Sequence, residues 1–393
     1  MNRKIIQGVT SSLTIVLIEE QIRFIEKNGY QVKVVCNEDF KKSYDDIKIR
    51  HIPFEREISI VKDMGSLYRL YRYLRAEKPD IINFSTPKAG LLGMVAGFLS
   101  GVDHRIYIQR GLRLETVTGL KYHLLYLTEK IACQLSTHVM VISDSLEAEM
   151  ISRKLLSRHK VVRIGRGSSN GTDMEKFNPE RIDTHQLSSL RNGLDIKPSD
   201  FVIGCVGRMT KDKGMNELVA AFTRLEKKYD HLKLLLVGDF ENGDPITERN
   251  RKTIADHDDI IHCPFTDSIE YYYSLMDLFA FPTFREGFGN VSIEAQAMGV
   301  PVVTFDATGA RDTVLDGRTG IIVKRMGAEG LTAALDDLIH DAEKRRRLAD
   351  QARNFAAGHF DRRHMQEALL KFYNSLGEQG DAVAEKNDGY LGA

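Results

Sequence analysis

The chain has 393 residues, 42% hydrophobic and 28% charged, and its 55 basic and 55 acidic side chains give a formal net charge of zero. This composition excludes a disordered chain, a fibrous repeat and a protein that binds nucleic acid through overall positive charge. The charge is unevenly divided: residues 1–178 hold 28 basic and 20 acidic side chains (net +8), whereas residues 179–393 hold 27 and 35 (net −8). Because single cores stop growing near about 250–300 residues, we expect two domains. The opposite net charges of the two halves indicate that these domains have different partners.

The cysteines and the apolar runs indicate the compartment. Cys36, Cys133, Cys205 and Cys263 lie far apart and form no metal or redox motif, which is typical of reduced thiols in a cytoplasmic protein. The longest apolar run, 91–102, is too short to span a bilayer. We therefore predict a cytoplasmic protein, soluble or peripheral at the inner face of the cell membrane, with no metal site and no cofactor.

Short β-rich runs alternate with helical patterns through the first half of the chain. A strand is expected at 4–9, and apolar residues at helical spacing predict one helix over 13–28 that ends at Gly29. Further strands are expected at 32–36, 47–54, 80–84, 105–109 and 139–143, and helices at 66–76, 89–99 and 121–135. This alternation predicts a mainly parallel sheet with helices on both faces.

The same alternation resumes after a glycine-rich linker at 165–179. Strands are expected at 201–206, 233–238, 260–265, 278–282, 301–305 and 320–323, with helices at 213–229, 328–340, 342–357 and 362–376. The predicted fold class is α/β, with two doubly wound Rossmann-like domains that face a central cleft. We place the first domain at 1–178, the second at 179–360, a helix that packs back on the first domain at 361–376, and a disordered tail at 377–393.

The segment that carries most chemical information runs from Phe281 to Ala295. A strand ends at Pro282, a loop carries Glu286, Gly287 and Gly289, and a helix begins near Asn290. Glycines let the backbone approach a ligand, and a helix amino terminus offers free N–H groups to an anion. The carboxylates of Glu286 and Glu294 suit sugar or ribose hydroxyls. Taken alone, however, the glycine pattern is explained better by an ordinary turn, with Glu294 in a helix-dipole role.

A second segment favours a ligand. Arg208 ends one strand and Lys213 opens the next helix, at the same edge of the same predicted sheet. Two cations five positions apart on such a loop can hold a diphosphate. No Gly-x-x-x-x-Gly-Lys-[Ser/Thr] motif is present, so ATP hydrolysis is not expected. Lys213 could also be an ordinary solvated lysine at the helix start, although that position is unfavourable for a cation.

Together these residues resemble the family 4 glycosyltransferases of the GT-B fold. The resemblance rests on Glu-Gly-Phe-Gly at 286–289, Glu-Ala-Gln-Ala-Met-Gly-Val-Pro-Val-Val at 294–303, Gly207-Arg208 with Lys213-Gly214, and 316–320. It is closest over 201–325. The amino-terminal half is similar to enzymes of bacterial capsule, exopolysaccharide and O-antigen synthesis, through 85–90 and 109–113.

The resemblance implies a role for each matched residue. Arg208 and Lys213 would neutralise the diphosphate of the donor, which is expected to be a UDP-sugar, and Glu286 would hold donor-sugar hydroxyls. These three are the predicted catalytic residues. The predicted donor-binding set adds the loop Gly287, Phe288, Gly289 and Asn290, through its backbone N–H groups, and Glu294, through the ribose. Transfer of a hexosyl or N-acetylhexosaminyl group with retention of anomeric configuration is implied, without a metal.

The chain departs from the family pattern at two places in its first half. Thr10-Ser11-Ser12 stand where many members have a Gly-Gly loop, and Arg110-Gly111 stand where many have His-Gly. Hydroxyls can still bind an acceptor, so Thr10, Ser11 and Ser12 are acceptor candidates together with Lys88 and Arg110. An alternative of equal weight for Arg110 is a salt bridge at the edge of the core.

The predicted partners follow from the resemblance and from charge. They are a nucleotide-sugar donor, a polyprenyl-diphosphate-linked saccharide acceptor and an anionic membrane surface, which would meet the cations and aromatics at 68–75. Two alternative functions are a GT-B nucleotide-sugar epimerase, which needs a general base that we do not find, and a two-lobed sugar-binding protein. A protein that binds free sugar would have no use for a diphosphate clamp.

Overall fold

The computed structural model describes residues 3–38, 44, 46–55, 59–168 and 170–378. The chain divides into two compact units. Unit 1 comprises the described residues of 1–108, 131–140 and 363–378, and unit 2 comprises those of 109–130 and 141–362. The sequence assigned 109–130 and 141–178 to the first domain, and its boundary at 178 stays a prediction. None of the described helices is both long and apolar enough to cross a membrane.

The first sheet has the strand order β3-β2-β1-β4-β5-β6-β7, and its β1–β2, β1–β4, β2–β3 and β4–β5 pairs are parallel. Its strands are β1 (Lys4–Ser11), β2 (Gln31–Asn37), β3 (Lys48–His51), β4 (Ile81–Ser85), β5 (His104–Gln109), β6 (His138–Val141) and β7 (Val161–Val162). The helices in this part of the chain are η1 (Ser12–Leu17), α1 (Glu19–Lys27), α2 (Ile60–Glu77), α3 (Pro87–Ser100), η2 (Arg113–Thr116), α4 (Gly119–Leu135), α5 (Asp144–Ser152) and η3 (Arg158–Lys160). The symbol η marks a 3-10 helix.

Helices cover both faces of the central strands in unit 1. A Cβ placed on Gly93 of α3 would meet the Phe84 ring of β4 at 2.4 Å, so α3 lies directly on that face. The neighbouring residue on β4, Asn83, donates a hydrogen bond to the Tyr373 hydroxyl of α13 (Arg362–Glu378). Successive strand residues point to opposite faces, so α3 and α13 cover opposite sides of β4. Helix α13 ends two residues beyond the predicted end at 376, and residues 379–393 of the predicted tail lie outside the described residues.

The second sheet belongs to unit 2 and repeats the same topology. Its order is β10-β9-β8-β11-β12-β13, and all five neighbouring pairs are parallel. Its strands are β8 (Phe201–Val206), β9 (Leu232–Val237), β10 (Ile260–Cys263), β11 (Leu278–Phe281), β12 (Val302–Phe305) and β13 (Gly320–Val323). The helices are η4 (Pro179–Arg181), α6 (Thr184–Gly193), α7 (Met215–Leu225), α8 (Glu248–Asp256), α9 (Ile269–Tyr273), α10 (Asn290–Ala297), η5 (Arg311–Thr313), α11 (Ala328–His340) and α12 (Ala342–Phe360).

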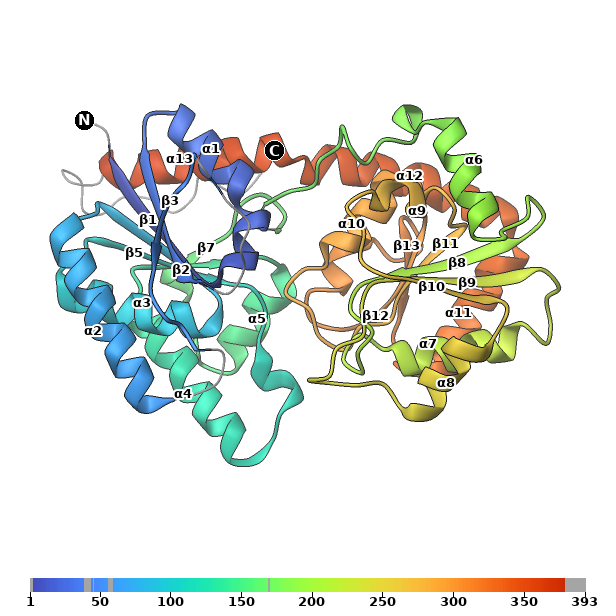
Figure 1. Cartoon of the computed structure of the whole chain (residues 1–393), viewed down its shortest axis with the longest axis horizontal. Coiled ribbons are helices and arrows are strands. Elements are labelled where there is room, and N and C mark those ends of the chain that lie inside the picture. Colours follow the sequence, from blue (N-terminus) through green and yellow to red (C-terminus); the bar gives the residue numbers. More distant parts are fainter. Residues whose placement is uncertain (1–2, 39–43, 45, 56–58, 169, 379–393) are drawn as a thin grey trace. The chain divides into compact units, whose positions relative to one another are not determined.

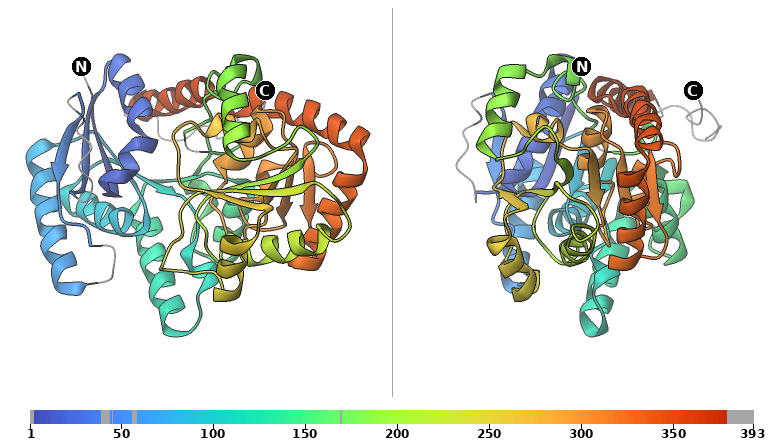
Figure 2. Two further views of the ribbon diagram at one scale, coloured as in Figure 1. Left: turned by 45° about the vertical axis from the view of Figure 1, so that its right-hand side comes forward. Right: turned by 90° about the vertical axis from the view of Figure 1, so that its right-hand side faces the viewer.

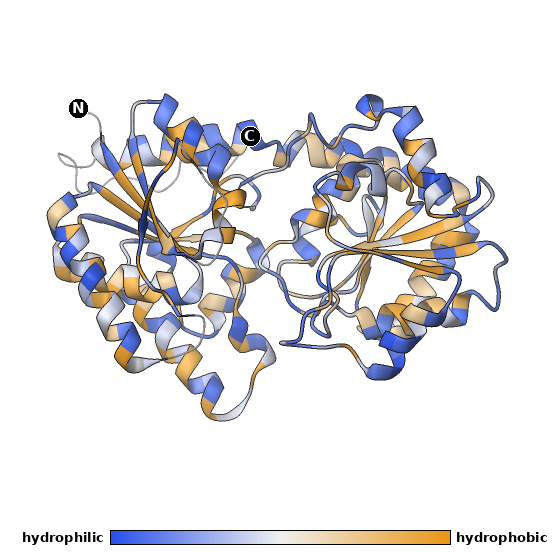
Figure 3. Ribbon diagram, viewed as in Figure 1, coloured by the Kyte–Doolittle hydropathy of each residue, from blue (hydrophilic) through white to orange (hydrophobic). Residues whose placement is uncertain are grey.

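Unit 2 is a three-layer structure. Helices α7, α8 and α11 lie along one face of its sheet and α9, α10 and α12 along the other (Figure 1), and two further views show the same layers (Figure 2). Most strands of both sheets are hydrophobic (Figure 3), as expected for parallel strands that are covered on both sides. The predicted α/β class, with two Rossmann-like halves, is confirmed.

The chain order reverses at one point in each sheet. In the first sheet this point lies between β1 and β4, and in the second between β8 and β11. The loops that follow two such strands run in opposite directions, which leaves a crevice at the carboxyl end of the sheet where ligands bind. The loops after β8 and β11 are the two segments that the sequence singled out.

One helix prediction is wrong. Instead of a single helix over 13–28, the chain forms η1, and α1 begins at Glu19. The run Thr14, Ile15 and Val16 is β-branched, which weakens an α-helix, and the Ser11 hydroxyl accepts a hydrogen bond from Leu13 N and so caps the 3-10 turn. The sequence also missed α6, which has no buried residue and therefore no apolar stripe to detect.

Candidate active site

A tight backbone contact brings together the two loops at the carboxyl end of the second sheet. Gly214, in the loop after β8, has φ +71°, and a Cβ there would lie 2.0 Å from the carbonyl oxygen of Pro282 after β11. Only glycine fits this position. The close approach sets Lys213, the preceding residue, beside the β11 loop. Helix α7 begins at Met215, so Lys213 belongs to the loop and not to the helix start that the sequence predicted.

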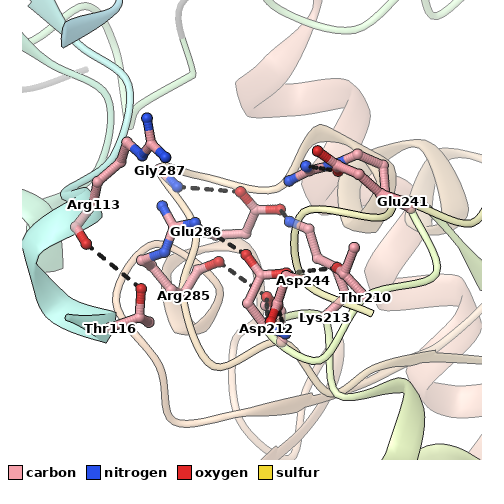
Figure 4. Close-up of polar contacts among 12 residues, drawn as sticks. Arg113, Thr116, Thr210, Asp212, Lys213, Glu241, Asp244, Arg285, Glu286 and Gly287 are labelled. Carbon is pink, nitrogen blue, oxygen red and sulfur yellow. Dashed lines mark hydrogen bonds and ion pairs between the residues drawn. The ribbon is translucent and has the colours of Figure 1, made fainter. Parts of the chain in front are cut away.

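Lys213 and Glu286 form an ion pair at the centre of this crevice (Figure 4). Their side chains are only 14% and 24% exposed. The second carboxylate oxygen of Glu286 accepts a hydrogen bond from Gly287 N at 3.3 Å. A mostly desolvated lysine and carboxylate interact more strongly than a surface pair, and either one becomes costly to bury without the other.

Asp212 is a second anionic centre that the sequence did not single out. It accepts hydrogen bonds from the Thr210 hydroxyl at 2.6 Å and from Arg285 Nη2 at 3.0 Å. Burial alone would raise the pKa of Asp212, but the Thr210 hydroxyl and the nearby cations outweigh it and hold this pKa below its usual value. Those cations are Lys213, Arg285 and Arg208, so the positive charges of both loops converge around one carboxylate.

Arg208 lies at a more open position of the same crevice. It forms an ion pair with Glu241, which follows β9 and is labelled in Figure 4. The two side chains are 54% and 44% exposed. The sequence missed Glu241 because its loop carries no motif. Arg208 and Lys213, the two cations predicted to bind a diphosphate, are thus each paired with a carboxylate. A bound diphosphate would take the place of these carboxylates as the anionic partner.

The backbone of the loop after β11 is held by neighbouring segments of unit 2. The buried Ser143 hydroxyl donates to the Gly287 carbonyl oxygen at 2.8 Å, and Glu286 N donates to the Thr308 carbonyl oxygen at 3.1 Å. A Cβ on Gly287 would lie 2.2 Å from the Arg110 carbonyl oxygen. The positions of Ser143 and Thr308 could not be derived from the sequence, because they depend on contacts between segments far apart in the chain.

Helix α10 begins at Asn290, as the sequence predicted, directly after this loop. Its N-cap is Gly289, with φ +100° and no side chain to cap the helix. The first N–H groups of the helix therefore lie next to Gly287 and Phe288 and can serve a ligand. Phe288 itself is buried.

Glu294 occupies the second turn of α10. Its carboxylate accepts a hydrogen bond from the Tyr273 hydroxyl at 3.0 Å. Burial raises the pKa of Glu294, and the Tyr273 hydrogen bond opposes that rise. Glu286, Arg208 and Lys213 thus gather at the crevice around the loop ends, whereas Glu294 lies deeper, on the helix.

The predicted acceptor residues are divided between the two units. In unit 1, the Thr10 and Thr86 hydroxyls lie 2.7 Å apart at the ends of β1 and β4, and Ser11 and Ser12 are buried beside them. Lys88 Nζ is bound to both oxygens of Asp63, at 2.7 and 2.8 Å. Arg110 lies in unit 2 next to the Glu286 loop, where burial lowers its pKa to about 10.

Two Rossmann-type sheets, with a cluster of paired cations and carboxylates at the switch point of the second, are typical of nucleotide-binding α/β enzymes of two units. Known families match both halves: Glycosyltransferase Family 4 over residues 16–169 and Glycosyl transferases group 1 over 188–355. The capsular polysaccharide biosynthesis glycosyltransferase CapM of Staphylococcus aureus is 39% identical over 95% of this chain and 98% of its own length. The chain belongs to the family 4 glycosyltransferases.

A more distant relative and a solved structure also match most of the chain. The UDP-Gal:alpha-D-GlcNAc-diphosphoundecaprenol alpha-1,3-galactosyltransferase of Escherichia coli is 24% identical over 80% of this chain and 82% of its own length. A crystal structure of HepE from Anabaena in complex with UDP superposes with a TM-score of 0.77 at 20% identity, over 95% of this chain and 100% of the other. The predicted glycosyltransferase and its α/β fold of the GT-B type are thereby confirmed.

Proposed function

We propose that this glycosyltransferase moves a hexosyl or N-acetylhexosaminyl group from a UDP-sugar to a lipid-linked saccharide, with retention of configuration, in the synthesis of a capsule or another bacterial surface polysaccharide. Support comes from the capsular role in the name of CapM, the UDP-Gal donor and diphosphoundecaprenol acceptor in the name of the Escherichia coli enzyme, and the UDP bound by HepE. The observation that carries the proposal is the partly buried Lys213–Glu286 pair at the switch point.

In this proposal the donor exchanges one set of ionic contacts for another. The diphosphate takes Lys213 and Arg208 from their carboxylate partners, which frees the Glu286 carboxylate to accept hydrogen bonds from the sugar hydroxyls. The N–H groups at the start of α10 face the sugar or phosphate, and Glu294 accepts from the ribose. The cations therefore keep an anionic partner before and after the donor binds.

The transfer itself then requires placement and stabilisation of the leaving group. The acceptor hydroxyl attacks the anomeric carbon on the face from which the diphosphate departs, the anomeric C–O bond to the diphosphate breaks, and the hydroxyl proton passes to the departing phosphate oxygen. Lys213 and Arg208 neutralise the charge that develops there. We propose that no metal takes part, and chelation with EDTA should leave the rate unchanged.

The acceptor and the membrane surface complete the proposal. Thr10, Ser11 and Ser12 in unit 1 and Arg110 in unit 2 are the candidate acceptor contacts. An anionic membrane surface would meet α2, where Met64, Tyr68, Arg69 and Arg72 are exposed. The O-antigen and the capsule are equally compatible with these contacts.

A radiolabelled UDP-sugar panel, assayed with membrane lipid extract, tests the function. We expect one donor to label the organic-soluble lipid fraction, and Glu286→Gln to weaken the binding of that UDP-sugar more than the binding of UDP. An epimerase would instead convert the donor to a second UDP-sugar without an acceptor, and a binding protein would give no product. Either result, or full transfer by Glu286→Gln, contradicts the proposal.

A further inference from the structure

The turn η2 brings a further carboxylate, Glu115, to the loop after β11 in unit 2. Figure 4 shows this turn beside the loop, and a Cβ on Gly111, just before the turn, would lie 3.2 Å from Gly287 N. Glu115 Oε1 accepts a hydrogen bond from the Thr308 hydroxyl at 2.7 Å. The carbonyl oxygen of the same Thr308 accepts from Glu286 N at 3.1 Å. One residue therefore connects Glu115 to the carboxylate at the centre of the crevice.

The second oxygen of the Glu115 carboxylate is unused. Glu115 Oε2 is shielded from solvent and has no hydrogen-bond partner among the residues that the structure describes. Burial and the charge of Glu149 raise the pKa of Glu115, and the Thr308 hydroxyl and the positive charges of Arg153 and Arg285 oppose that rise. A shielded carboxylate oxygen without a donor is costly, because it has given up water and gained no hydrogen bond in exchange.

Arg285 carries an unused group of the opposite kind. Its Nη2 donates to Asp212 at 3.0 Å, whereas its Nε is shielded from solvent and lacks a hydrogen-bond partner within the described part of the chain. Arg285 directly precedes Glu286 in the sequence, and Asp212 directly precedes Lys213. The unused acceptor of Glu115 and the unused donor of Arg285 are thus both fixed to the loops of the proposed donor site.

An unused acceptor close to an unused donor limits the chemistry of a ligand. A carboxylate oxygen only accepts hydrogen bonds, and a guanidinium Nε only donates them. A sugar hydroxyl does both, so one hydroxyl or two adjacent hydroxyls can satisfy the pair. A phosphate oxygen would be repelled by the carboxylate, and an ammonium group by the guanidinium. The pair therefore suits the neutral sugar of a nucleotide-sugar and not its diphosphate.

A ligand needs little movement of the protein to reach these atoms. Glu115 and Arg285 are half-buried residues, so part of each side chain already reaches solvent. The last torsion of a glutamate side chain is soft, and the carboxylate can rotate to meet a hydroxyl.

We propose that Glu115 and Arg285 form a second sugar-recognition pair, beside Glu286, that binds a hydroxyl of the donor sugar. This inference rests on the proposed UDP-sugar donor. The donor sugar is favoured over the acceptor saccharide because the hydrogen bonds of both residues lead to the donor loops, through Thr308 in one case and Asp212 in the other.

Glu115→Gln separates sugar recognition from support of the loop. The amide oxygen of glutamine can still accept from Thr308, whereas its amide nitrogen puts a donor in place of the unused acceptor. Titration calorimetry with UDP, UDP-glucose, UDP-galactose, UDP-N-acetylglucosamine and UDP-N-acetylgalactosamine measures the effect. We expect Glu115→Gln to weaken the binding of the preferred UDP-sugar by about tenfold or more and to leave the binding of UDP unchanged. The control for the loss of one nearby charge is Glu149→Gln on α5.

Two further variants test the partners of Glu115. Thr308→Val removes the bond to Glu115 Oε1 and leaves Oε2 an acceptor, so it should weaken UDP-sugar binding less than Glu115→Gln does. Arg285→Lys keeps a cation beside Asp212 and removes the Nε donor. If Glu115 and Arg285 bind the same sugar, the double variant should lose less affinity than the sum of the two single losses. Additive losses, or a larger loss in Thr308→Val, overturn the pair.

The remaining outcomes are equally decisive. An unchanged ratio of UDP-sugar to UDP affinity in Glu115→Gln, or an equal change in Glu149→Gln, overturns the inference. A raised KM for the acceptor with unchanged donor binding assigns the hydroxyl to the acceptor saccharide and overturns the donor assignment. A wild type that shows the Glu115-dependent affinity but transfers sugar to no lipid acceptor contradicts the proposed function and leaves the recognition pair standing.

Discussion

The switch points of the two sheets have the same topology and different chemistry. At the second sheet, Lys213, Glu286 and Asp212 bring ionised groups into a mostly buried network. At the first, the hydroxyls of Thr10 and Thr86 meet at 2.7 Å, and the nearby Lys88 is held by Asp63. The fold therefore fixes where a ligand can bind, and the side chains decide which one. A charged crevice suits a sugar diphosphate, and a neutral one suits saccharide hydroxyls.

Among the variants that test this difference between the two switch points, removal of Lys213, the central cation of the second, should have the largest effect on activity. Lys213→Ala leaves Glu286 partly buried without its cation and removes one charge from the proposed diphosphate site. We expect kcat/KM to fall about 10–200-fold or more. The control is Lys211→Ala, an exposed lysine of the same loop. Equal losses in the two variants, measured with the preferred donor, would show that the effect is not specific to the crevice.

A substitution in the neutral crevice of unit 1 should change the KM for the acceptor and leave the KM for the donor unchanged. Thr10→Val keeps the shape of the side chain and removes the hydroxyl that bonds to Thr86. We expect the KM for the acceptor to rise about 5–10-fold, the size of one lost hydrogen bond, with the donor KM unchanged. A change in the donor KM instead would place Thr10 at the donor site and remove the distinction between the two crevices.

If Glu294 belongs to the donor site as proposed, its titration should make both stability and donor affinity depend on pH. Burial raises its folded-state pKa, so the stability that this group contributes is present at low pH and is lost as the pH rises through that raised value. Glu294→Gln removes the buried charge, so we expect its stability relative to wild type to increase with pH.

Donor affinity should follow the opposite trend. The ionised carboxylate is the better acceptor for ribose hydroxyls, so wild-type donor affinity should rise as the pH rises through the same range, and that of Glu294→Gln should stay flat. Urea unfolding and donor titrations across mildly acidic to mildly alkaline pH measure both quantities. Parallel pH profiles for the two proteins would contradict this role.

The sequence predicted the parts of the site that depend on short-range pattern. Arg208, Lys213 and the 286–290 loop follow predicted strands, and the rule that ligands bind at the carboxyl ends of parallel strands brings them to one edge. The parts that it missed depend on contacts between distant segments. Glu241 meets Arg208 only because β9 lies beside β8, and Ser143 reaches Gly287 across 144 positions of the chain.

The secondary structure divides in the same way into elements that the sequence predicts and elements that it does not. Most strands were predicted to within a few residues, because parallel strands buried on both faces are continuous apolar runs. Helix α6 was missed because it buries none of its side chains, and the helix over 13–28 was wrong because its β-branched run prefers another conformation. The acceptor contact of Lys88 stays a prediction, and its ion pair with Asp63 of α2 could not be derived from any local pattern.

The smallest expected effect concerns the open end of the charged crevice. Glu241 forms an ion pair with Arg208, and both side chains are about half exposed. Because water screens the pair, it contributes at most about 1 kcal/mol to stability. In the proposed donor site a diphosphate must displace Glu241 before Arg208 can bind it, so Glu241→Gln should lower the donor KM, by no more than about fivefold, without a change in kcat. Glu248→Gln, at the start of the neighbouring helix α8, is the matched control for the loss of one surface charge. A weaker donor interaction in Glu241→Gln would mean that Glu241 binds the donor directly and belongs with Glu286 among the sugar-binding carboxylates.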